Sequence, residues 1–236
     1  MKKLASTTAL ALAVIVLARP ASAQSYGSSY HPGNAIRLDL GAFQPEASSS
    51  YWDGVFEDFR GDKNDFRDVS FGVEYQRDLS GPWLLMAGIH GFDTTVTQSY
   101  RRFVDNNDRP IRHDTNLQLA TATFGFAVRL SPRGAPVVPY LGAGAALVSW
   151  ELEEKGDFID FEAQPRRVFS ARFNDDGVAY GWYGLVGLEV PVSSAMSFFA
   201  EGRWTDAEDD LSGDFEDLGK LDLSGRALSA GVSWRF

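Results

Sequence analysis

The chain has 236 residues, of which 44% are hydrophobic and 13% aromatic, and it contains no cysteine. That length fits one large domain better than two small ones. The lack of cysteine excludes a disulfide-stapled fold, a thiolate metal site and a cysteine nucleophile. The mean hydropathy of -0.20 argues against a helical membrane protein, but a membrane β-barrel needs apolar side chains only at alternate strand positions.

Residues 1–23 carry the pattern of a secretory signal peptide. A basic start precedes an apolar run from Ala9 to Ala18, and Ala21-Ser22-Ala23 forms a small-residue cleavage site. Cleavage there leaves 19 basic residues against 32 acidic ones, because three of the 22 basic residues and no acidic residue lie before it. A chain this acidic is a poor partner for nucleic acid. Residues 24–33, rich in Ser, Tyr and Gly, are predicted to be a flexible lead-in.

From residue 34 onward the chain is typical of successive β-strands, because apolar side chains recur with a period of two. Six segments show this alternation clearly: residues 36–42, 69–76, 123–130, 182–190, 198–204 and 228–236. Two more, Trp83–Thr97 and Val137–Trp150, are strand-like but apolar on both faces for part of their length. The total is eight strands, each near the ~9 to 11 residues that a tilted strand needs to cross a membrane. No helix with convincing periodicity is predicted.

The connections between these strands alternate in length. Short turns rich in Gly, Pro and Ser lie around residues 80–82, 131–134 and 193–194, whereas long connections cover residues 45–67, 99–114, 151–178 and 206–220. This alternation is typical of an up-and-down barrel with short periplasmic turns and long extracellular loops. We therefore predict an all-β fold over residues 34–236, an eight-stranded antiparallel up-and-down transmembrane β-barrel with both termini in the periplasm.

A soluble, lipocalin-like eight-stranded barrel is the main alternative, and its apolar side would face inward. Two observations argue against it. The polar side is mostly Gly, Ala, Ser and Thr, which suits a narrow interior, and aromatic residues on the apolar side lie toward strand ends, as in membrane-interface girdles.

In the six segments that alternate clearly, every charged residue lies on the side of the strand that otherwise carries small residues. That side is predicted to be the lumen, because Arg or Lys facing lipid at mid-depth costs about 2 to 4 kcal/mol. Eight strands enclose a bore that side chains just fill, so these charges are expected to pair with one another. The predicted lumen network comprises Arg37, Asp39, Glu74, Arg129, Glu189, Glu201, Arg203 and Arg235. Packing is one interpretation of this network, and a gated pore whose pairs rearrange to admit small ions is the other.

The segment Ser229–Phe236 resembles the terminal signal by which the barrel assembly machinery recognises outer-membrane β-barrels, with Gly231, Trp234 and Phe236 at its key positions. Residues 139–145, Pro-Tyr-Leu-Gly-Ala-Gly-Ala, resemble a Gly-alternating strand of the small outer-membrane β-barrel superfamily that includes OmpA-type and OmpX-type proteins. The resemblance implies a fold and a location in a Gram-negative outer membrane. It does not extend to the peptidoglycan-binding domain that OmpA-type proteins carry after their barrel.

The three histidines give little basis for catalysis. His90 is expected to be an interior, hydrogen-bonded residue, whereas His31 and His113 lie in the lead-in and near a loop end, where solvated histidines are ordinary. Barrels that modify lipid A use a His with Ser or Asp at the outer rim, and His113-Asp114-Thr115 matches neither of their local patterns. The prediction is therefore no enzyme activity and no catalytic residue.

The predicted long loops carry most of the acidic residues, as in the run Asp206-Ala207-Glu208-Asp209-Asp210. Their spacing fits no EF-hand, so solvated loops are predicted, with no metal site and no cofactor. Several aromatic side chains lie within residues 51–66 of the first predicted loop. They indicate that this loop either folds on itself or presents an apolar patch. Four arginines of the second loop could meet outer-leaflet phosphates or neutralise the neighbouring acids: Arg101, Arg102, Arg109 and Arg112.

Together these features predict a structural or surface-interaction protein that supports envelope integrity and contacts lipopolysaccharide, a surface or another cell through its loops. Its expected partners are outer-membrane lipids, lipopolysaccharide and, during biogenesis, the barrel assembly machinery, with a surface ligand left open. A narrow gated channel for ions or small solutes is the alternative, and a lipid A-modifying enzyme is a third class.

Overall fold

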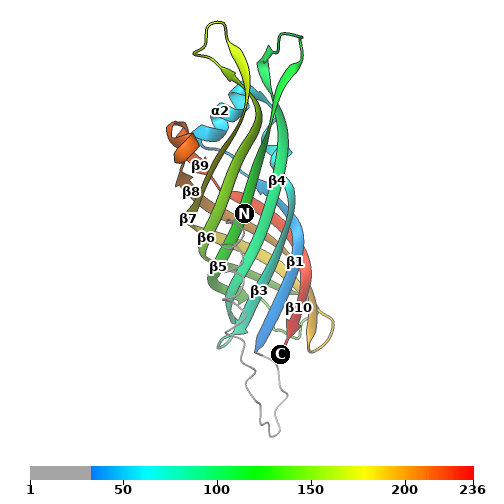
Figure 1. The fold of residues 1–236 in the computed structure, drawn as a ribbon. Helices are drawn as coiled ribbons and strands as arrows, with labels where there is room; N and C mark the ends of the chain where they lie inside the picture. The colour runs from blue at the N-terminus through cyan, green and yellow to red at the C-terminus, as the bar shows by residue number, and fades with distance from the viewer. Residues whose placement is uncertain (1–32) are drawn as a thin grey trace, which may run out of the picture.

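The computed structural model describes residues 33–236, in which eight antiparallel strands close into a ring (Figure 1). The ring strands are β1 (Asn34–Pro45), β3 (Asp68–Asp78), β4 (Trp83–Val104), β5 (Pro110–Arg129), β6 (Val138–Asp160), β7 (Arg167–Pro191), β8 (Met196–Asp210) and β10 (Gly225–Arg235). Each strand pairs with the next, and β10 pairs with both β8 and β1. This confirms the predicted eight-stranded antiparallel transmembrane barrel. The predicted signal peptide, 1–23, and all of the predicted lead-in except Gly33 lie outside the described residues.

The two ends of the barrel differ in their connections. At one end, here the turn end, short connections join β3 to β4, β5 to β6 and β7 to β8, and the C-terminus lies there too (Figure 1). At the other end, here the hairpin end, β4 and β5 meet across residues 105–109 and β6 and β7 meet across residues 161–166. These two hairpins rise above the rest of the barrel (Figure 1).

The outer surface of the barrel is apolar over the part nearer the turn end. Leu38, Phe71, Phe126 and Trp182 lie on four different strands and are 51%, 61%, 50% and 56% exposed. A belt of this kind is stable in hydrocarbon and not in water. The soluble, lipocalin-like alternative is wrong, because it would place this side of the strands inward.

The strands at the hairpin end are much longer than predicted. Residues 99–104 and 110–114 belong to β4 and β5, and β6 and β7 pair from Ser149↔Val178 to Asp160↔Arg167. The predictions of long loops over 99–114 and 151–178 are therefore wrong. They assumed that a strand ends where the membrane ends, whereas these strands continue as paired ladders beyond the apolar belt.

The alternation of polar and apolar residues inverts along these long strands. In β5, Phe124 and Phe126 face outward within the belt, whereas further toward the hairpin end Leu117 and Leu119 are buried inside and Gln118 is exposed. The inversion has a physical cause. Hydrocarbon contacts the outside of the belt, but water contacts the outside of the extension, so there the apolar side chains must pack into the interior.

Two segments close the barrel at the hairpin end, and we call them the cap. The first connects β1 to β3 and contains α2 (Ser50–Asp58), β2 (Phe59–Arg60) and the 3₁₀ helix Lys63–Phe66. The second connects β8 to β10 and contains the 3₁₀ helix Gly213–Leu218 and β9 (Lys220–Asp222). Among residues 33–236, no helix is long and apolar enough to cross a membrane.

Helix α2 corrects the prediction that the chain contains no convincing helix. It has nine residues, too few for a periodic pattern to emerge, and Gly54 lowers its helix propensity. The helix buries Tyr51, Trp52 and Val55, and the Trp52 indole donates to the backbone oxygen of Asp222 at 3.1 Å. Tertiary packing of one face therefore stabilises this helix, and the two cap segments are joined to each other.

Candidate functional site in the barrel lumen

Four buried charged residues form a closed ring of ion pairs across the lumen. Arg37 Nη1 donates to Glu74 Oε1 at 2.6 Å and to Glu201 Oε2 at 3.1 Å. Arg203 Nη2 donates to Glu74 Oε2 at 2.9 Å and to Glu201 Oε1 at 2.8 Å. The four residues come from β1, β3 and β8, so each guanidinium joins both carboxylates. Charge-assisted hydrogen bonds of this kind compensate the loss of hydration, and the ring occupies the bore of the barrel.

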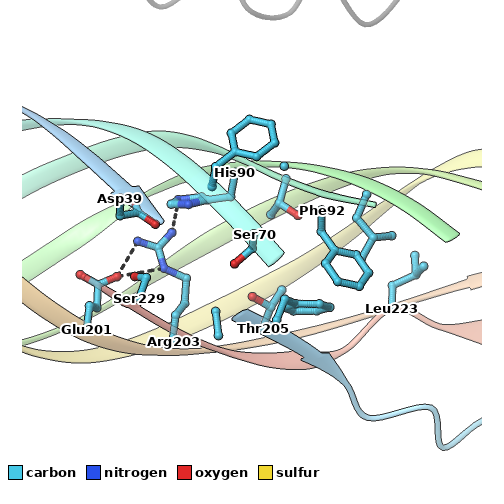
Figure 2. Close-up of a pocket in the computed structure, with 15 residues that line it drawn as sticks. Asp39, Ser70, His90, Phe92, Glu201, Arg203, Thr205, Leu223 and Ser229 are labelled. Carbon is cyan, nitrogen blue, oxygen red and sulfur yellow. Dashed lines mark hydrogen bonds and ion pairs between the residues drawn. The ribbon is translucent and has the colours of Figure 1, made fainter. Parts of the chain in front are cut away.

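Tyr140 and His90 extend this ring to two further strands, β6 and β4. The Tyr140 hydroxyl accepts from Arg37 Nη2 at 2.5 Å and donates to Glu201 Oε2 at 2.9 Å. Arg203 contacts His90 Nε2 on the other side (Figure 2). The sequence pattern does not reveal Tyr140 as a lumen residue, because its strand is apolar on both faces. We call these six residues the ion-pair layer: Arg37, Glu74, His90, Tyr140, Glu201 and Arg203.

A second charged group surrounds the opening of the lumen at the turn end. Arg235 pairs with Glu189, Arg129 Nη1 lies 2.8 Å from Asp78 Oδ1, and Arg133 also pairs with Asp78. These arginines and Asp78 line an open mouth of about 770 Å³. The residues of the predicted network therefore lie in two groups at different depths. Buried apolar side chains separate them, among them Leu84, Met86 and Leu185.

A small cavity of about 50 Å³ lies on the hairpin side of the ion-pair layer (Figure 2). Polar groups of Asp39, His90, Glu201 and Arg203 line one side of it, and apolar groups line the other. Asp39, a member of the predicted network, has no ion pair within 4.0 Å among residues 33–236. The cavity has room for a few water molecules, which suits its mixed lining.

An apolar plug fills the lumen between this cavity and the cap. Phe92 and Leu119 from the strands lie in one buried cluster with Trp52 and Phe66 from the cap. Phe43 packs against this cluster, and its ring lies 4.8 Å from that of Phe92. The bore is therefore occupied at two levels, first by charge pairs and then by close-packed aromatic and aliphatic side chains.

Two of the three residues of the predicted assembly signal, Gly231 and Trp234, lie on β10, the strand that closes the ring. Gly231 pairs with Asp39 on β1 and with Phe199 on β8, and a Cβ at this position would overlap the backbone oxygen of Leu38. Trp234 is exposed on the outer surface, and Phe236 follows the end of β10. Their recognition by the assembly machinery stays a prediction.

His113 is buried, in contrast to the solvated position predicted for it. It lies inside β5, on the extension beyond the apolar belt, and is 2% exposed. The rings of Phe59 and Phe158 lie 4.3 and 5.1 Å from the imidazole, and neither ring nitrogen has a hydrogen-bond partner among residues 33–236. Burial lowers the pKa of His113 to about 4, and nearby Asp114 opposes this only in part.

Replacing His113 by Phe tests this environment. The unfolded chain takes up a proton on His113 below about 6.5, the ordinary value, but the folded chain does so only near 4. The contribution of neutral His113 to the free energy of unfolding is therefore fully present above pH 6.5. It is lost progressively as the pH drops toward 4. We expect the variant to be at least as stable at pH 7.5, with an advantage that grows between pH 6.5 and 4. Urea midpoints measured across this range check it, and a pH-independent difference would contradict it.

Glu154 corrects the prediction that the acidic loops are solvated. It lies on β6 beyond the apolar belt, is 7% exposed, and accepts a hydrogen bond from the Tyr51 hydroxyl at 2.6 Å. Burial raises the pKa of Glu154, and this hydrogen bond opposes the shift. The first predicted loop likewise folds on itself, because Tyr51, Trp52 and Phe66 are buried. Across residues 33–236, no three His, Asp or Glu side chains form a group that could hold a metal ion.

Comparison with known proteins places this architecture in a family. The model of the outer membrane protein beta-barrel domain matches residues 9–236. The chain belongs to this family. A search of curated proteins found no match.

Two solved structures illustrate the shared fold of the outer-membrane barrel. Neisserial surface protein A (NspA) has a TM-score of 0.52 and 14% identity, with 86% of this chain and 97% of that chain covered. The outer membrane protein OprG from Pseudomonas aeruginosa has a TM-score of 0.54 and 13% identity, with 88% and 97% covered. At these identities the likeness shows the fold alone.

Proposed function

We propose that this outer-membrane barrel is a closed, non-catalytic structural protein that displays a rigid surface to the cell exterior. In this proposal the turn end faces the periplasm and the hairpin end faces outward, as the short turns and long hairpins of such barrels suggest. The single observation that carries it is the occupied lumen. The ion-pair layer and the apolar plug succeed each other along the bore, so neither ions nor solutes have an open path.

The energetics of the ion-pair layer favour a permanently closed state. Opening a path for ions requires Arg37 or Arg203 to leave two carboxylates in a bore shielded from bulk water. Breaking a buried pair on one side typically costs about 3 to 5 kcal/mol. The plug must also separate, which exposes buried aromatic rings to water. A narrow gated channel is the competing interpretation. Each opening of such a channel would have to overcome both the cost of breaking the ion pairs and the cost of separating the plug.

The β4–β5 hairpin carries three arginines that support contact with phosphate groups of lipopolysaccharide. Arg109 and Arg112 have no ion pair within 4.0 Å among the described residues, and Arg101 donates only to the backbone oxygens of Phe56 and Gly61. None of these three guanidinium groups is therefore held in a close salt bridge within the described part of the chain. Arginine suits phosphate recognition because its planar donors match phosphate oxygens.

Planar bilayers with lipopolysaccharide in the outer leaflet test the proposal. We expect the refolded chain to insert without unitary conductance steps, because both lumen closures persist. On lipopolysaccharide-coated surfaces, the double variant R109Q/R112Q should be retained less well than the wild type, with a weaker dependence on salt.

The matched control is R226Q, which removes an exposed arginine already paired with Glu46 at 2.9 Å. Its retention should equal that of the wild type. Reproducible unitary steps would reject the closed lumen in favour of the channel, and equal retention of all three proteins would reject the lipopolysaccharide contact.

A further inference from the structure

A cleft of about 290 Å³ lies at the hairpin end, where it borders the apolar cluster of the plug. Its walls come from α2, β6, β7 and the 3₁₀ helix Gly213–Leu218, so both cap segments and two barrel strands contribute. This volume is at the lower limit of the ~300 to 1,000 Å³ that is typical of ligand pockets. The cleft therefore suits a small molecule.

Aromatic rings surround this cleft in a connected series. Tyr51 and Phe215 have ring centroids 6.0 Å apart, Phe215 and Phe173 6.4 Å, and Phe173 and Phe158 5.0 Å. All four residues line the cleft, and Phe59 lines it as well. Aromatic faces attract cations through their quadrupole, and cages of such rings bind quaternary ammonium groups.

The charged groups of the cleft are all acidic. Within the described part of the chain, its lining contains Glu154, Asp58 and Asp214 and no basic residue. Asp58 has Arg102 at 3.7 Å, and Asp214 accepts from the backbone N–H of Asn174 at 3.0 Å. Both of these acids therefore have partners within the chain.

Glu154 differs from them because it is buried and has no cation within 4.0 Å among residues 33–236. Its one hydrogen bond, from Tyr51, stabilises the carboxylate but leaves its charge uncompensated. A buried carboxyl group without a cation takes up a proton more readily, and a positive charge in the cleft would stabilise its ionised form. Calcium and magnesium require about six oxygen ligands, and the aromatic lining does not supply them.

We propose that this cleft binds a small organic monocation of the quaternary or methylated ammonium class, with the aromatic rings around its alkyl groups and Glu154 as its counter-charge. The occupant is a free small molecule and not a metal ion or a peptide. The inference does not rest on the closed lumen, because none of the residues that line the cleft belongs to the ion-pair layer.

Isothermal titration of the refolded full chain with choline tests this inference. A non-ionic maltoside detergent is required, since choline and amine-oxide head groups of other detergents would compete. The neutral carbon isostere 3,3-dimethyl-1-butanol has nearly the same shape without the charge. We expect choline to bind at least about tenfold more tightly than the isostere, the affinity ratio of a single desolvated cation–π and charge contact.

The variant E154Q should weaken choline binding by about tenfold or more, because the amide keeps an acceptor for Tyr51 but removes the charge. The control E153Q removes the same charge from the neighbouring residue, which points away from the interior and pairs with Arg172, and should bind choline as the wild type does. Equal affinity for choline and its isostere, no binding of choline, or equal effects of the two variants would overturn the proposal. The comparison of the two ligands on the wild type decides the matter even if E154Q does not fold.

Discussion

Replacing Arg37 by Met is expected to lower the free energy of unfolding by about 3 to 5 kcal/mol, the usual cost of breaking a buried ion pair on one side. The variant leaves Glu74 and Glu201 to share Arg203, and it removes the donor to Tyr140. It also removes the guanidinium that lies 3.6 Å from the centre of the Phe199 ring. Urea unfolding in phospholipid vesicles, followed by tryptophan fluorescence, measures this loss.

Two further variants separate charge balance from the loss of a large side chain. The double variant R37M/E201Q leaves one guanidinium for Glu74 and should recover part of the lost stability, because fewer buried charges lack a partner. R226M removes an exposed arginine paired with Glu46 and should change stability by no more than about 1 kcal/mol. If R37M matched R226M, the ion-pair layer would contribute little to the closure of the barrel.

Replacing Val232 by Arg should either block assembly or cost about 2 to 4 kcal/mol, the penalty for a basic side chain that faces lipid at mid-depth. Val232 lies on the outer face of β10, between Leu38 of β1 and Phe198 of β8, and both neighbours are exposed apolar residues. The new guanidinium would therefore lie among hydrocarbon chains with no acidic partner on that face. The heat-modifiable mobility of the folded barrel on gels reports assembly, and urea unfolding reports stability.

Ser233→Ala is the matched control on the adjacent residue. Ser233 faces the interior, and its hydroxyl is buried with no hydrogen-bond partner in the described residues, 33–236. Its removal should be neutral or slightly stabilising, since no hydrogen bond is lost. Equal tolerance of arginine at Val232 and of alanine at Ser233 would contradict the assigned facing of β10.

The barrel itself was predictable from the sequence because lipid imposes a strict two-residue period on each crossing. In β1, Leu38 must face hydrocarbon, and its neighbours Arg37 and Asp39 are thereby directed inward. The predicted alternation of short and long connections indicated the up-and-down topology, although most of the predicted loops 99–114 and 151–178 belong to strands. Such features depend on residues close together in the chain, so local patterns are sufficient to reveal them.

The partners inside the lumen were not predictable from the sequence. Alternation places Arg37 and Glu201 inward, but the contact between them joins residues 164 positions apart and depends on the stagger of the strands around the ring. The inward position of Tyr140 was not predictable either. Its strand is apolar on both faces because one of those faces meets lipid and the other meets the interior core.

The sequence by itself therefore determined the membrane-crossing period, the strand number and the inward position of the charges, since the surrounding solvent dictates these residue by residue. Only the tertiary structure decided the length of β4 to β7, the burial of His113 and Glu154, and the folding of the cap over the bore. Beyond the membrane the solvent outside the barrel changes from hydrocarbon to water. The apolar residues of each strand therefore face outward within the membrane and inward beyond it. Where each side chain then lies depends on packing between segments that are distant in the chain.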